Sequence, residues 1–68
     1  MKPVSGRQIC KALERKGWVL DRVRDSHHIY KKLGRPGTIP VPVHGNKTLK
    51  PKTQQSIMKS AGLRDDDL

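Results

Sequence analysis

The chain has 68 residues and a formal net charge of +9, with 15 Lys and Arg against 6 Asp and Glu. No apolar run approaches the ~20 residues of a membrane-spanning helix, and a single cysteine excludes an internal disulfide or a zinc site of several cysteines. The basic excess favours an anionic partner, namely RNA, DNA, an acidic protein or an anionic membrane surface.

The first predicted element is a helix over 5–16. Ser5 is a suitable N-cap residue, and Gly17 is a suitable residue to stop the helix. Between them, the following apolar residues recur at helical spacing: Ile9, Cys10, Ala12 and Leu13. We therefore expect Cys10 to be a small buried hydrophobe in a reducing compartment.

Three strands are predicted next, over 18–24, 27–33 and 38–43. The residue types of the first strand favour β-structure, although its alternation of apolar and polar residues is imperfect. A short turn at 25–26 joins it to the second strand. The third strand alternates β-branched residues with two prolines. Because proline cannot donate to a sheet ladder, we expect this strand at an edge, with its proline nitrogens facing away from the partner strand.

A second helix is predicted over 51–61, because proline suits its first turn and a glycine follows its end. The order α-β-β-β-α predicts an α+β fold, a three-stranded antiparallel sheet with both helices on one face. We expect one domain over 1–68, with its core at about 4–63 and a charged, frayed tail at 64–68. The residues expected in the core are Trp18, Leu20, Val23, Ile29, Ile39, Val41, Val43, Ile9, Leu13, Ile57 and Met58.

Two adjacent histidines, His27 and His28, follow the turn at 25–26. With an unperturbed pKa of about 6.5, histidine is the side chain that gives and takes protons near neutrality. In a strongly basic chain, this pattern is typical of a protein that binds nucleic acid and cuts it. Further side chains are predicted to contact RNA, through charge, hydrogen bonding or stacking: Arg22, Arg24, Tyr30, Lys31, Lys32, His44 and Lys47.

Short segments between about residue 5 and residue 63 carry a family resemblance. They are Ser5-Gly6-Arg7, Lys16-Gly17-Trp18, Ser26-His27-His28-Ile29-Tyr30, Ile39-Pro40-Val41-Pro42-Val43-His44-Gly45-Asn46, Leu49-Lys50-Pro51, Ser56-Ile57 and Ala61-Gly62-Leu63. In this order and spacing they resemble the HicA-type toxins. The resemblance implies a double-stranded-RNA-binding-like fold, ribonuclease activity on mRNA and an antitoxin partner of the HicB type.

The family's motif is Gly-Ser-His, and its histidine is needed for cleavage. Here the motif reads Asp25-Ser26-His27, so an aspartate replaces the glycine. Aspartate tolerates turns and left-handed backbone conformations better than most residues, so we expect the turn geometry to survive. Its negative charge beside His27 is expected to oppose RNA binding.

RNA carries its own nucleophile, the 2′-OH, so cleavage without a metal needs a base, a donor for the leaving 5′-oxygen and cations around the phosphorane. Family spacing favours His27 as the catalytic residue. If Ile29 packs inward, strand alternation places His28 and Tyr30 on the outward face and favours His28 instead. We favour His27 and keep His28 as the alternative. His44 either contacts RNA, completes an acid–base pair or is a turn residue.

No cofactor is expected, and a metal site built from the three histidines is disfavoured because adjacent strand residues point apart and no paired carboxylate is nearby. The leading interpretation is a cytoplasmic endoribonuclease toxin that acts on mRNA. One alternative is a non-catalytic RNA-binding module of the same fold. Another is a small interaction protein whose basic face docks an acidic partner.

Overall fold

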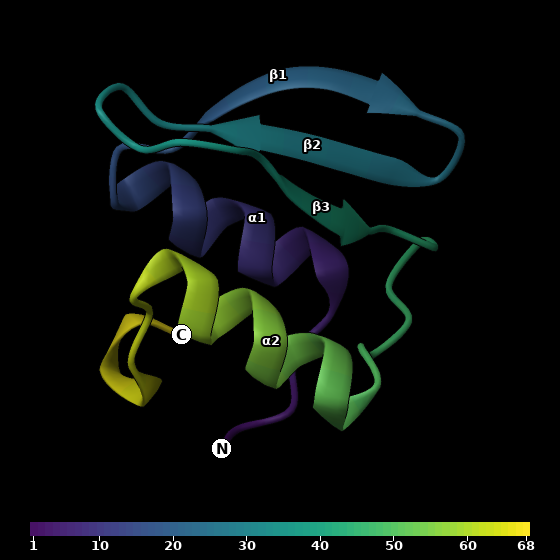
Figure 1. Cartoon of the computed structure of the whole chain (residues 1–68). Helices are drawn as coiled ribbons and strands as arrows, with labels where there is room; N and C mark the ends of the chain where they lie inside the picture. Colours follow the sequence, from purple (N-terminus) through teal and green to yellow (C-terminus); the bar gives the residue numbers. More distant parts are fainter.

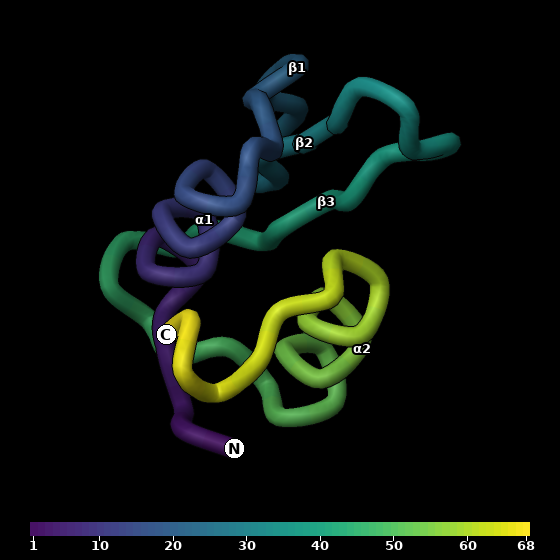
Figure 2. The backbone as a smooth tube through the Cα atoms, turned by 90° about the vertical axis from the view of Figure 1, so that its left-hand side faces the viewer, coloured from purple at the N-terminus to yellow at the C-terminus, as the bar shows by residue number.

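The computed structural model describes residues 1–68. Its elements are α1 (Gly6–Arg15), β1 (Val19–Arg24), β2 (His27–Lys31), β3 (Ile39–Pro42), α2 (Pro51–Ala61) and the short 3₁₀ helix η1 (Asp65–Asp67). The strands form one antiparallel sheet in the order β1-β2-β3, and both helices lie on the same face of it (Figures 1 and 2). The predicted double-stranded-RNA-binding-like α+β fold is confirmed. The helices have 10 and 11 residues, and neither is long and apolar enough to cross a bilayer.

A capping box starts α1. The Ser5 hydroxyl accepts a hydrogen bond from the backbone N–H of Gln8 at 3.2 Å, and the Gln8 side chain accepts one from the N–H of Ser5 at 2.8 Å. After the helix, Gly17 takes φ +92° and turns the chain toward β1. The face of α1 toward the sheet is fully buried at Ile9, Ala12 and Leu13.

The start of α1 packs directly on the backbone at the end of β3. A Cβ atom on Gly6 would lie 2.1 Å from the carbonyl oxygen of Pro42 and 3.1 Å from its carbonyl carbon. Only a hydrogen fits in that space. Gly6 therefore lets the helix approach the sheet more closely than any other residue would.

A β-bulge at Asp21 explains the imperfect alternation of β1. Leu20 lies opposite Tyr30, whereas Arg22 lies opposite Ile29, so Asp21 is the extra residue on its strand. The bulge changes which side chains share a face of the sheet. From Arg22 to the turn, the pairing of β1 with β2 is shifted by one residue relative to the pairing before the bulge.

The side chains of β1 are poorly covered. Leu20 and Val23, both expected in the core, are 41% and 54% exposed, and the other four residues of the strand are exposed as well. Both lie opposite residues on the helix side of β2, but β1 is the outer strand, and its contact with α1 leaves both side chains exposed to solvent. The core prediction is therefore wrong at these two positions.

β3 lies at the other edge of the sheet, as predicted. Pro40 and Pro42 lie opposite residues of β2, and the N–H of Val43 donates to the carbonyl of Ser26 at 2.8 Å. Hydrogen-bonded pairs alternate along an antiparallel ladder, so both prolines occupy positions whose nitrogens face away from β2.

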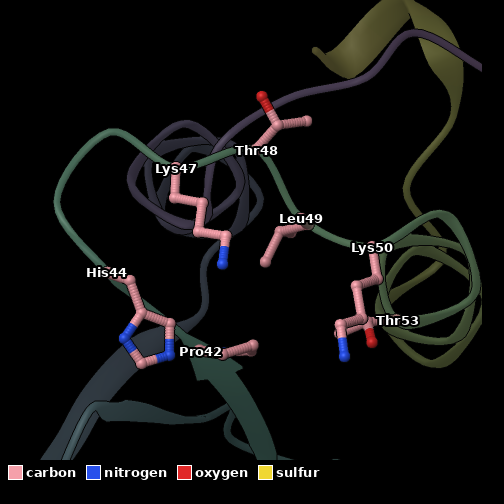
Figure 3. Close-up of a pocket in the computed structure, with 7 residues that line it drawn as sticks. All are labelled: Pro42, His44, Lys47, Thr48, Leu49, Lys50 and Thr53. Atoms are coloured by element: carbon pink, nitrogen blue, oxygen red, sulfur yellow. The ribbon is translucent and has the colours of Figure 1, made fainter.

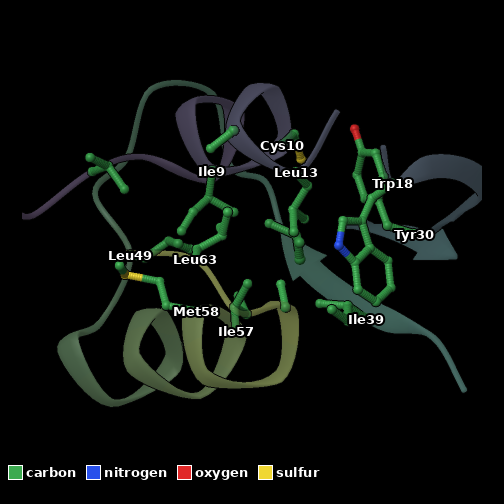
Figure 4. Packing of buried hydrophobic residues seen from close by; sticks show 14 residues of the cluster. Ile9, Cys10, Leu13, Trp18, Tyr30, Ile39, Leu49, Ile57, Met58 and Leu63 are labelled. Carbon is green, nitrogen blue, oxygen red and sulfur yellow. The ribbon is translucent and has the colours of Figure 1, made fainter. Parts of the chain in front are cut away.

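The core fills the space between the sheet and the two helices (Figure 4). It consists of Val4, Ile9, Cys10, Ala12, Leu13, Trp18, Tyr30, Ile39, Val41, Leu49, Ile57, Met58, Ala61 and Leu63. Ile29 is also buried but does not belong to this cluster, because it lies on the opposite face of the sheet. Val43 packs against the cluster only in part.

A buried glutamine joins the segment before α1 to α2. Gln54 is 1% exposed, and its Oε1 accepts a hydrogen bond from the N–H of Val4 at 3.2 Å. The carbonyl of Val4 accepts one from the N–H of Leu49 at 2.9 Å, and Ser5 forms a β-bridge with Thr48. These contacts hold the loop before α2 against the start of α1.

The expectation of a frayed tail is wrong for η1. The carboxylate of Asp67 accepts a hydrogen bond from the N–H of Arg64 at 2.8 Å and lies 3.1 Å from the Lys16 ammonium. These two contacts hold the pKa of Asp67 below its ordinary value. Arg15 donates to the backbone carbonyl of Asp67 at 2.8 Å, so the tail closes on the end of α1.

Candidate nucleic-acid site

His27 lies at the start of the central strand β2, on the face of the sheet away from the helices. Its side chain is exposed, and its cross-strand neighbours are Arg24 and Pro42. A shallow depression of about 350 Å³ opens beside it, lined by Arg24, Asp25, His27, Ile29 and Pro40. This position combines a titratable imidazole with an adjacent cation and open access from solvent.

Asp25 takes φ +55° and is the one non-glycine residue of the chain with a positive φ. Two-residue hairpin turns favour glycine where φ is positive, because a Cβ atom is crowded there. The expectation that aspartate keeps the turn is supported by this left-handed conformation. The carboxylate stands two residues before His27 and lines the same depression.

We expect Asp25→Gly to raise the free energy of unfolding by about 0.5–1 kcal/mol, because relief of left-handed strain outweighs the extra flexibility of unfolded glycine. We also expect it to strengthen RNA binding, since it removes a negative charge beside His27. Urea denaturation and RNA titration measure the two effects. Asp25→Asn is the matched control, which removes the charge but keeps a residue that tolerates this conformation. A glycine variant that is less stable than the parent would contradict the strain argument.

Two of the predicted RNA contacts already have a counter-ion within the protein. Asp21 pairs with Arg22, and its other carboxylate oxygen lies 3.2 Å from the Lys31 ammonium. The hydrogen bond from Lys31, and then the contact with Arg22, lower the pKa of Asp21. Lys32 comes at the far end of β2 from the turn, where its side chain passes over Gly17. The structure therefore brings Lys32 to a different region from His27.

Tyr30, predicted to stack on a base or donate to RNA, lies in the core instead. It is 1% exposed, and its hydroxyl donates to the Glu14 carboxylate at 2.6 Å. Burial and then the Glu14 carboxylate raise the pKa of the phenol. Figure 4 shows the ring beside Trp18. The prediction is wrong because Ile29 occupies the open face, which turns Tyr30 toward α1.

His28 lies on the same side of the sheet as Tyr30 and is half-buried. It lines a groove of about 450 Å³ together with Arg7, Cys10, Lys11, Glu14, Leu20, Tyr30 and Val43. The two adjacent histidines therefore face opposite sides of the sheet. His28 and Tyr30 do share a face, but it is the face toward the helices and not the outward face considered from the sequence.

His44 and Lys47 come from the loop between β3 and α2. They line a pocket of about 300 Å³ with Pro42, Thr48, Leu49, Lys50 and Thr53 (Figure 3). Pro42 also lies directly opposite His27 in the sheet. His27 and His44 are thus at the same end of the sheet, on either side of Pro42. No three His, Cys, Asp or Glu side chains gather as a possible metal-ligand group.

Sequence reasoning missed the cations Arg7, Lys11 and Lys50, which line depressions near this end of the sheet. Arg7 and Lys11 are four residues apart on α1 and so share one face of the helix. That spacing was the signal that could have identified them as a pair.

Comparison with protein families gives a match over most of the chain. The family described as "HicA toxin of bacterial toxin-antitoxin" matches residues 6–63. The matched range includes both helices, all three strands and the histidines described above. A comparison with curated proteins finds no match.

Proposed function

Because the chain belongs to the HicA family of toxins of bacterial toxin–antitoxin systems, we propose that it is an endoribonuclease that cleaves mRNA without a metal ion. The observation that supports this most is the exposed His27 beside Arg24. By its place in the motif Asp25-Ser26-His27, it corresponds to the histidine that the resemblance gives as needed for cleavage. His44 at the same end of the sheet offers a second proton-transfer group.

In the proposed reaction, one of these two histidines removes the proton from a ribose 2′-OH. The 2′-oxygen then forms a bond to the adjacent phosphorus, and the bond from phosphorus to the 5′-oxygen breaks. The other histidine gives its proton to that leaving oxygen. Arg24 and Lys47 stabilise the negative charge on the phosphorane. The products are a 2′,3′-cyclic phosphate and a 5′-hydroxyl, so DNA is not a substrate.

Incubation of the purified protein with an end-labelled single-stranded RNA in excess EDTA tests this proposal. We expect cleavage products that end in 2′,3′-cyclic phosphate and no cleavage of a DNA of the same sequence. RNA binding without cleavage would instead support the alternative function, a non-catalytic RNA-binding module. Cleavage that EDTA abolishes and added Mg²⁺ restores would contradict the metal-independent mechanism.

The partner that we propose is a HicB-type antitoxin, and the proposed compartment is the cytoplasm, where mRNA is translated. An antitoxin that covers His27 with an acidic or apolar surface would exclude RNA from the site. It would also stabilise this small domain by mass action, because it binds only the folded state.

A further inference from the structure

Two depressions, one on each side of Thr48, lie along α1 and the loop before α2, and we call them together the path. One is the pocket of Figure 3, which contains His44, Lys47 and Lys50. The other, of about 470 Å³, is lined by Ser5, Arg7, Gln8, Lys11, Asn46 and Thr48. Thr48 is the residue that lines both, and its side chain points away from the pocket of Figure 3. We call the four cations Arg7, Lys11, Lys47 and Lys50 the basic band.

No carboxylate lines either depression, and none of the four cations of the basic band takes part in a salt bridge. The acidic residues of the chain lie elsewhere. Asp21 pairs with Arg22 and Lys31, and Asp25 stands at the turn. Glu14 accepts a hydrogen bond from Tyr30 in the neighbouring groove, and the other three are in η1. The basic band is therefore a group of four cations that no carboxylate pairs with.

The other lining groups of the second depression are hydroxyls and side-chain amides, with no apolar residue among them. Cations together with neutral hydrogen-bonding groups match a phosphodiester backbone, which offers charge and acceptor oxygens. An apolar protein segment would find little to contact there. The chemistry of the path thus favours a nucleic-acid strand over an apolar protein segment.

The path also leads to the proposed catalytic histidine. The pocket of Figure 3 includes Pro42, the cross-strand neighbour of His27. The bridge between Ser5 and Thr48 and the hydrogen bond from Leu49 to Val4 hold the two sides of the path together. The cations therefore stand on two elements whose relative position the fold fixes in advance.

We propose that the basic band binds phosphates of the RNA strand on one side of the scissile bond and carries more of the RNA affinity than Arg22 and Lys31. This inference rests on the ribonuclease function proposed above. In this arrangement, one stretch of RNA lies along α1 and the loop, and the next nucleotide crosses Pro42 to reach His27.

The test uses a single-stranded 2′-O-methyl RNA, which lacks the nucleophile and so reports binding whether or not the protein cleaves. Two double variants, Arg7→Gln/Lys11→Gln and Lys47→Gln/Lys50→Gln, remove parts of the basic band. Arg22→Gln/Lys31→Gln makes the same charge change on the open face. The control variant Lys2→Gln/Lys59→Gln makes the same charge change at two exposed lysines that line none of these depressions.

We expect each basic-band variant to bind this RNA about tenfold more weakly than the Lys2/Lys59 control. The slope of log affinity against log salt should fall by about 1.4, the value for two lost phosphate contacts on a single strand. The Arg22/Lys31 variant should lose less. Circular dichroism verifies that all variants are folded.

The inference is overturned if both basic-band variants bind as tightly as the Lys2/Lys59 control. It is also overturned if they keep RNA affinity but lose a partner protein that co-purifies with the parent, since the band would then be a protein-docking surface. A parent protein that binds the modified RNA but leaves unmodified RNA intact would refute the ribonuclease function and leave the RNA-binding band standing.

Discussion

Replacing His27 with alanine is expected to slow RNA cleavage by about 10²–10⁴-fold, the usual cost of losing a general acid or base. Its side chain is exposed at the turn and supports no core contact, so folding and RNA affinity should change little. Single-turnover cleavage of a labelled RNA measures the rate, and the 2′-O-methyl RNA measures affinity separately.

The other two histidines serve as internal comparisons. His44→Ala should also reduce the rate, because His44 is the proposed second proton-transfer group and lies at the same end of the sheet as His27. His28→Ala should have a smaller effect, since this residue faces the helix side and is half-buried there. A larger loss from His28→Ala than from His27→Ala would move the reaction to the groove beside α1. Wild-type cleavage by all three variants would refute histidine catalysis.

Gly6→Ala is expected to lower the free energy of unfolding by about 3 kcal/mol, near the upper end of typical overpacking costs. In an ordinary helix this change stabilises, because alanine has the higher helix propensity. Here the new Cβ would lie 2.1 Å from the carbonyl oxygen of Pro42, and a strand backbone cannot move aside as a flexible side chain can. The loss is a large share of the stability of a small domain.

Urea denaturation followed by circular dichroism measures this effect. Gly45→Ala is the matched control, since a Cβ at Gly45 meets no atom within 4 Å and costs only the strain of φ +57°. If Gly6→Ala is as stable as the parent, α1 can shift away from β3, and the close contact does not hold the helix in place.

The order of the elements could be predicted, and their ends to within two residues, because their signals are local. Ser5 caps α1, Pro51 starts α2, and the two prolines of β3 require an edge. The bulge at Asp21 could not be predicted, since one extra residue in a strand changes the faces without any distinctive residue type. The wrong inward orientation of Ile29 led directly to the wrong role for Tyr30.

The candidate site could likewise be predicted where its residues are close in sequence, and not where distant segments meet. The motif around His27 identified the end of the sheet, because a turn and its flanking strands are close in sequence. Lys47 was predicted, but the rest of the basic band was missed because α1 and the loop are joined through the bridge between Ser5 and Thr48, which links distant parts of the chain. Such a contact depends on how α1 and the loop pack, and no local pattern encodes it.

The exposed outer strand β1 is expected to unfold locally more often than the rest of the sheet. All six residues of β1 are exposed and its outer edge pairs with no other strand, whereas β2 is hydrogen-bonded on both sides. Local unfolding starts where buried contacts are fewest, so amide hydrogens of β1 should exchange with deuterium well before those of β2. Opening of β1 would carry Arg22 and Arg24 away while His27 stays anchored to β3. Fluctuation of one strand would then alter how the protein holds RNA without displacing the histidine proposed to cut it.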